Sequence, residues 1–213
     1  MSPQPIQPVR AVHPIEARSY QILRRRADTS ALPPLTRAVI ERVIHASADL
    51  DYLGDVQISS EADLEKAREA LASGCPVVTD AHMVAAGITS VKAICRVRDV
   101  VAAKGLTRSA AGIRRAHAEV GPGAVWVIGN APTALEELLT LDADPALVVG
   151  LPVGFVGAAE SKAALRASGL PAVSNVSEKG GSAVAAAAVN ALLYATPQVL
   201  RAARGRAASR DRA

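Results

Sequence analysis

Histidine is the side chain best suited to trade a proton near neutral pH, and His45 has the most suggestive neighbours of the four histidines in the chain. It lies in the segment RVIHASAD, with Glu41 one turn before it and Arg42 three residues before it. Asp49 follows at i+4, where a continuing helix would bring its carboxylate beside the imidazole. His45 is therefore a candidate general acid or base, and the alternative is a structural or merely exposed histidine.

Other catalytic and metal-binding patterns are missing from the sequence. The histidines are dispersed, and Cys75 and Cys95 form neither a CxxC motif nor a Cys/His cluster with metal-ligand spacing. No Ser/His/Asp or Cys/His set has the spacing of a known nucleophile family. The sequence therefore predicts no metal site and no nucleophilic triad.

Two N-terminal helices must position His45. The apolar spacing predicts helices over residues 14–28 and 34–48, and Pro33 and Pro34 mark the start of the second. One face of the first helix combines a serine with large apolar residues, namely Ile15, Ser19, Ile22 and Leu23. This face is expected to pack on the rest of the protein.

After these helices, short apolar runs alternate with amphipathic segments. The runs are continuously apolar, which is typical of parallel strands covered on both faces. Strand–helix alternation with short links predicts a three-layer α/β sandwich with a mainly parallel sheet. The predicted strands are 76–79, 124–128, 146–150 and 171–174, and the predicted helices are 61–73, 108–119, 132–141, 157–168 and 181–195.

In such sheets, ligands bind in the loops beyond the carboxyl ends of the strands. The first of these loops begins with Thr79 and Asp80. Asp80 could take part in a site or simply cap the next helix. His82 follows two residues later and could face either way.

The loop GNAPTAL after the strand 124–128 resembles an anion site. Pro132 suits a first helical position, and Asn130 and Thr133 offer polar groups beside free backbone N–H groups. A carboxylate ligand is expected there, and the alternative is a well-capped link without a ligand.

Two further segments could bind carboxylates. Lys179 precedes Gly181 and Ser182, which open a long alanine-rich helix, and Arg108 and Ser109 open another helix after Thr107. Arginine can grip a carboxylate with two hydrogen bonds, although Arg108 could equally be a solvated residue behind a capping threonine. Several anion sites on one sheet edge predict a multiply charged ligand.

Nucleotide binding is disfavoured. Gly150, Gly154 and Gly157 are spaced GxxxGxxG rather than GxGxxG, and the pattern GxxxxGK[ST] is absent. Three glycines within eight residues still indicate that backbone approaches a ligand or a partner subunit.

Composition limits the class of partner. The net charge of +4 resides in residues 201–213, which carry five arginines and one acidic residue, so the rest of the chain is neutral. We expect a flexible lead at 1–12, one domain at 13–196 and a basic, disordered tail at 197–213. The scarcity of aromatic residues argues against nucleic-acid binding, and no apolar run is long enough for a membrane span. The Pro-rich start MSPQPIQPV lacks the apolar region of a secretory signal. A cytoplasmic protein is expected.

Seven segments together resemble one family, that of the precorrin-8X methylmutases, over about residues 13–195. They occur in the family's order, and they are ARSYQIL, RVIHASAD, TDAHMVAAGI, TRSAAGI, IGNAPTALEELL, LPVGFVGAAESK and KGGSAVAAAAVNAL. The chain departs from the family's commoner pattern at His82 and in the segment NVSEKGGS, which leaves the form of the substrate open.

The resemblance implies a Rossmann-like three-layer sandwich that forms homodimers with pockets near the interface. It also implies an isomerase that moves a methyl group from carbon 11 to carbon 12 of precorrin-8X, giving hydrogenobyrinate without a cofactor. His45 matches the family's proton-transferring histidine, and Ser19 and Arg42 match substrate-contacting residues. Cobalt-precorrin-8 as substrate and a non-catalytic tetrapyrrole carrier are the alternatives.

Overall fold

The computed structural model describes residues 13–101 and 103–195 of the 213-residue chain. The predicted lead and tail lie outside these residues. In the described part, five strands form one sheet in the order β1-β5-β4-β3-β2. All neighbours pair in parallel except β1 and β5, so the predicted mainly parallel sheet is confirmed. The strands are β1 Val56–Ile58, β2 Val77–Thr79, β3 Val125–Ile128, β4 Leu147–Gly150 and β5 Ala172–Asn175.

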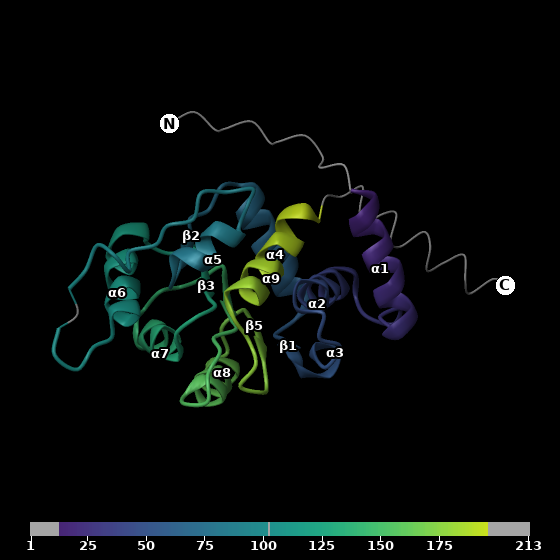
Figure 1. Ribbon diagram of the computed structural model, residues 1–213. Coiled ribbons are helices and arrows are strands. Elements are labelled where there is room, and N and C mark those ends of the chain that lie inside the picture. The colour runs from purple at the N-terminus through teal and green to yellow at the C-terminus, as the bar shows by residue number, and fades with distance from the viewer. Residues whose placement is uncertain (1–12, 102, 196–213) are drawn as a thin grey trace.

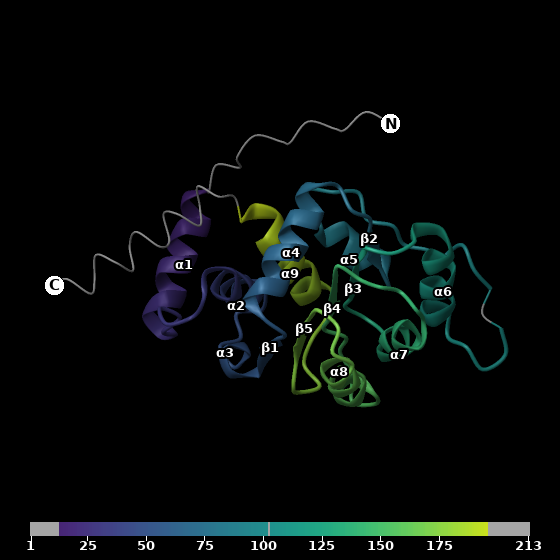
Figure 2. The same cartoon turned by 180° about the vertical axis from the view of Figure 1, so that it is seen from behind.

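Helices cover both faces of the sheet, which makes the three layers visible in Figures 1 and 2. One face carries α4 (Glu61–Ala72), α5 (His82–Gly87) and α9 (Ser182–Tyr194). The other face carries α6 (Arg108–Val120), α7 (Pro132–Thr140) and α8 (Ala158–Ala167). The remaining helices are α1 Pro14–Arg26, α2 Pro34–Ser47 and α3 Tyr52–Asp55, of which α2 packs along α9.

Side chains of each strand alternate between two apolar layers, because successive residues point to opposite faces. In β3, Val125 and Val127 join the layer under α9, whereas Trp126 and Ile128 join the layer under α6 to α8. Trp126, the single tryptophan, is fully buried. The sheet is therefore covered on both faces, as the continuously apolar strands require.

The predicted apolar face of the first helix is only partly correct. Leu23 is buried, but Ile15 and Ile22 are 74% and 47% exposed. The helix also ends at Arg26 rather than at residue 28, because Ala27 adopts an extended conformation. Polar contacts to α2, described below, therefore carry much of the attachment of α1.

The short elements β1 and α3 are absent from the prediction, and the helix expected after Asp80 (α5) had no predicted bounds. β1 has three residues and α3 has four, which is too short for a periodic signal. β1 matters for the site because it pairs antiparallel with β5 and brings the end of α3 beside the loop that follows β5.

Candidate active site

His45 lies in the last turn of α2, half-buried against α1. Its Nδ1 atom is 2.9 Å from the Ser19 hydroxyl oxygen, and its ring stacks on Tyr20 with a centroid distance of 5.0 Å and an interplanar angle of 8°. A hydroxyl can donate or accept, so Ser19 can pair with Nδ1 in either tautomer. These contacts fix the imidazole plane and leave Nε2 without a partner among the described residues.

Arg42 lies one turn before His45 and joins the same group. Its Nη1 atom donates to a carboxylate oxygen of Glu16 and, at 3.3 Å, to the Tyr20 hydroxyl, and its guanidinium lies 5.1 Å from the Tyr194 ring centroid. Burial raises the pKa of Tyr20, so the phenol remains neutral and accepts from Arg42. Ser19, Tyr20, Arg42 and His45 thus form one packed group, here called the histidine cluster.

Glu41 attaches α1 to α2 directly behind the histidine cluster. The carboxylate is buried and accepts hydrogen bonds from Arg24 at 2.9 and 2.6 Å, from Thr29 at 2.6 Å and from Arg37 at 2.8 Å. Burial by itself raises the pKa of Glu41, but these hydrogen bonds together lower it by a larger amount, so the net shift is downward. Glu41 therefore holds in place the helix that supplies Ser19 and Tyr20.

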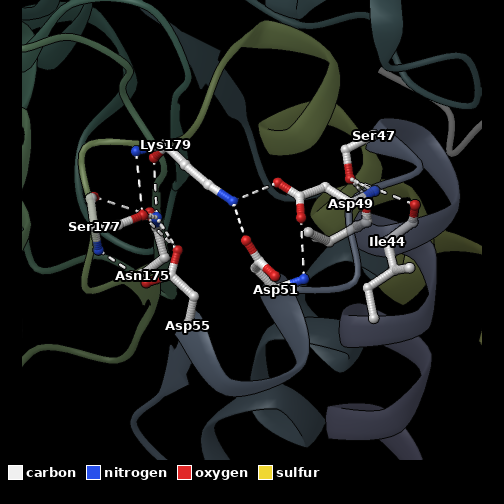
Figure 3. Close-up of polar contacts among 9 residues, drawn as sticks. Ile44, Ser47, Asp49, Asp51, Asp55, Asn175, Ser177 and Lys179 are labelled. Atoms are coloured by element: carbon white, nitrogen blue, oxygen red, sulfur yellow. Dashed lines mark hydrogen bonds and ion pairs between the residues drawn. The ribbon is translucent and has the colours of Figure 1, made fainter. Parts of the chain in front are cut away.

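Asp49 does not contact His45, contrary to the expectation from the i+4 spacing. The helix ends at Ser47, and Ala48 adopts a left-handed conformation with φ 55°, so Asp49 turns away. Its carboxylate instead accepts from Lys179 Nζ at 2.7 Å, and Asp51 accepts from the same ammonium at 2.6 Å (Figure 3). Both carboxylates raise the pKa of Lys179. Lys179 is thus neutralised within the chain, and Ser19 is the residue that orients His45.

Asp80 does not cap the helix α5 that follows it. Its buried carboxylate accepts from the backbone N–H groups of Gly129, Asn130 and Ala131 at 3.0, 2.9 and 2.7 Å. Asp80 therefore binds the amides before α7 that were expected to receive a ligand carboxylate. Thr79 beside it is also buried, and its hydroxyl oxygen has no hydrogen-bond partner among the described residues.

The remaining predicted polar residues gather where α6 and α7 begin. Thr107 caps α6, and its hydroxyl lies 2.8 Å from that of Thr133 in the first turn of α7, beside a cavity of about 200 Å³. Arg108 is exposed, and its side chain has no partner among the described residues. Arg108, Ser109, Asn130 and Thr133 are called the arginine cluster below. Figures 1 and 2 place α6 and α7 at the opposite end of the molecule from α1 and α2.

Helix α9 begins between the two clusters. No side chain caps its first turn, and Ser182 follows Gly181, whose N–H donates to Leu151 O at 2.9 Å. An uncapped helix N-terminus offers N–H groups and a positive dipole end to an anion. The segments that follow β2, β4 and β5 also expose large apolar side chains, namely Met83 in α5 and Val153, Phe155, Val156 and Val176 in loops.

Neither a metal site nor a membrane helix is found in the part of the chain that the structure describes. Residues 13–101 and 103–195 contain no group of three or more histidine, cysteine or acidic residues that could hold a metal ion. None of the helices in these ranges is long and apolar enough to cross a membrane.

A Rossmann-like sandwich with a histidine held by a serine and a tyrosine between its N-terminal helices is an architecture found in small-molecule enzymes of the α/β class. Within that class, the chain belongs to the precorrin-8X methylmutase family, because the family model described as precorrin-8X methylmutase matches residues 14–195. Members of this family are isomerases of cobalamin synthesis, and the chain is such an isomerase.

Individual relatives agree with the family. The chain is 45% identical to a cobalt-precorrin-8 methylmutase of Salmonella typhimurium, over 84% of this chain and 93% of the relative. It is 43% identical to a precorrin-8X methylmutase of Pseudomonas aeruginosa, with the same coverage. A crystal structure of precorrin-8X methylmutase from Thermus thermophilus superposes with a TM-score of 0.74 at 32% identity, covering 85% of this chain and 96% of that one.

Proposed function

We propose that this chain moves the methyl group of precorrin-8X from carbon 11 to carbon 12, giving hydrogenobyrinate, with His45 as proton donor and acceptor. The reaction is an isomerisation in which the bond from carbon 11 to the methyl group breaks and the bond from carbon 12 forms. A proton transferred at a ring nitrogen allows the conjugated system to reorganise, and no cofactor is consumed. The observation that carries the proposal is the orientation of His45 by Ser19 and Tyr20, which leaves Nε2 for a ligand.

The surroundings of His45 suit a polycarboxylate macrocycle. We propose that exposed apolar loops pack on the ring and that its carboxylates bind Ser19, Arg42, Arg108, Ser109, Asn130, Thr133, Gly181 and Ser182. Thr79 is buried and Lys179 is already paired with two carboxylates, so both are better explained as supports of these loops.

The two clusters lie at opposite ends of the molecule, which supports the further proposal that the protein is a homodimer with its pockets near the interface. We also propose that it is cytoplasmic. In such a dimer, the exposed apolar side chains at the carboxyl edge would be covered. Sedimentation of the purified protein tests this: a monomer at micromolar concentration would contradict it.

A relative named for the cobalt form and a relative named for the metal-free form have similar sequence identity to this chain. The metal-free substrate is proposed, and cobalt-precorrin-8 is the alternative. Each substrate is supplied to the purified protein, and the visible spectrum is followed. Turnover of the cobalt form alone would overturn the choice of substrate.

The His45→Ala variant separates an enzyme from a carrier. Loss of general acid–base catalysis is expected to lower turnover about 10²- to 10⁴-fold while product binding is retained. The matched control is His117→Ala, because His117 contacts Asp142 and Trp126 away from the histidine cluster. Unchanged turnover in His45→Ala would disprove the assigned role of this residue.

A further inference from the structure

Lys162 is a fully buried lysine that the proposed reaction does not use. It lies in the second turn of α8, and its side chain has no solvent exposure. The ammonium donates to Asn175 Oδ1 at 2.8 Å, to Lys179 O at 2.7 Å and to Ser177 O. Three donors therefore meet three oxygens, and all three acceptors lie at the end of β5 or in the loop that follows it.

Asp55 holds the same loop from the opposite side. At the end of α3, its carboxylate accepts from the N–H groups of Val176 and Ser177 at 2.9 and 2.8 Å and from the Ser177 hydroxyl at 2.6 Å. Asn175 joins the two anchors, since its Nδ2 atom donates to Asp55 at 2.8 Å and to Lys179 O at 2.9 Å. Figure 3 shows Asp55, Asn175 and Ser177 gathered at this loop.

Lys179 connects this loop to the helix that carries His45. Its carbonyl oxygen is held by Lys162 and Asn175, while its side chain reaches Asp49 and Asp51 beyond the end of α2. The next residue, Gly180, has φ 159°, and a Cβ atom there would lie 2.4 Å from Leu151 O. The backbone around Lys179 is therefore confined on both sides, and its ammonium is held by Asp49 and Asp51.

We propose that Lys162 is a positioning residue: it fixes the loop 176–181 so that Lys179 holds the end of α2, which sets the position of His45 relative to the start of α9. This inference rests on the proposed role of His45. The burial of Lys162 supports it, because a buried ammonium is costly and no carboxylate pairs with it directly among the described residues. Burial lowers the pKa of Lys162 to about 8. A methionine would fill the same volume without the cost of burying a charge. The hydrogen bonds to the loop are therefore what the lysine contributes at this position.

The test is a double-mutant cycle on turnover. Lys162→Met and Lys179→Met remove the two ends of the connection, and each is expected to lower kcat about tenfold, since small displacements of a catalytic group have effects of that order. The double variant should be no slower than the slower single variant, because both substitutions break one connection. Losses in kcat that multiply in the double variant would overturn the proposal.

Arg166→Met is the matched control. Arg166 lies one turn beyond Lys162 on α8 and donates to Asn175 O at 2.6 Å, but it donates no hydrogen bond to residues 176–181. It should leave kcat unchanged. If Lys162→Met fails to fold, Lys179→Met still decides the proposal, because Lys179 is partly exposed and its loss should leave the melting temperature unchanged. Unchanged kcat in Lys179→Met would overturn the proposal.

A second readout does not depend on activity. Amide hydrogen exchange in Lys162→Met should accelerate both in the loop 176–181 and at the end of α2 over residues 44–51, and Arg166→Met should change neither. Acceleration in the loop alone would overturn the positioning role. If wild type turned over neither substrate, the proposed function would fail, and hydrogen exchange would still decide whether Lys162 positions α2.

Discussion

The two polar clusters at the carboxyl edge of the sheet differ in how their charges are satisfied. In the histidine cluster, Arg42 is bound by Glu16 and Tyr20, and the buried Glu41 behind it is bound by two arginines. In the arginine cluster, Arg108 is exposed and has no partner among the described residues. The side chains of the histidine cluster are thus already paired within the protein, whereas the arginine cluster presents the guanidinium of Arg108 to a ligand. Preorganisation suits proton transfer, and a free cation suits capture of a carboxylate.

One large effect that would separate the two ends is on stability. Removing one partner of a buried ion pair costs about 3–5 kcal/mol, but Arg24 is 47% exposed and can be solvated when it loses Glu41. Glu41→Ala is therefore expected to lower the free energy of unfolding by about 2 kcal/mol, measured by urea denaturation. Arg108→Ala should change it by less than about 0.5 kcal/mol. Equal losses of unfolding free energy in Glu41→Ala and Arg108→Ala would contradict this difference between the two clusters.

The pH dependence of stability sharpens this prediction. The pKa of Glu41 is lowered in the folded protein, so its contribution is fully present above the unfolded pKa and is lost as the pH falls through the folded one. In urea titrations, the stability gap between wild type and Glu41→Gln should be largest near neutral pH and should narrow below about pH 4. A gap that stays constant down to pH 2 would contradict the assigned charge of Glu41.

Ligand binding should show the opposite contrast. Arg108→Ala should weaken binding of the tetrapyrrole product by about 1.5–3 kcal/mol, the usual cost of losing a charge-assisted hydrogen bond. Titration followed by absorbance measures this, and Arg115→Ala is the control, because Arg115 lies on the same helix and pairs with Glu119. Normal binding by Arg108→Ala would mean that the arginine cluster does not contact the ligand.

The smallest effect is expected at Ser19. Ser19→Ala removes the hydrogen bond to Nδ1 of His45 but leaves the stacking of Tyr20, so turnover should fall about fivefold, equivalent to about 1 kcal/mol. Product binding should weaken less than in Arg108→Ala, because the hydroxyl that is proposed to contact the ligand carries no charge. A fall in turnover as large as that of His45→Ala would show that Ser19 takes part in the proton transfer itself.

The fold could be predicted largely from the sequence because its strands are continuously apolar and its helices are long. The expected strand 124–128 and helix 132–141 differ from β3 and α7 by one residue each. The site was less predictable, because its contacts join distant segments. Ser19 lies 26 residues before His45, and Lys179 lies 130 residues after Asp49. The predicted contact between Asp49 and His45 was wrong because the i+4 rule assumes that the helix continues, whereas α2 ends at Ser47.

The burial of Trp126 has a practical consequence. Since the protein has one tryptophan, all indole emission comes from the middle of β3, behind the loop that carries Asn130. A bound tetrapyrrole absorbs visible and near-ultraviolet light, so it would quench this emission by energy transfer wherever it sits along the nearby sheet edge. The protein therefore contains its own optical sensor for ligand occupancy, which reports binding even in variants that have lost turnover.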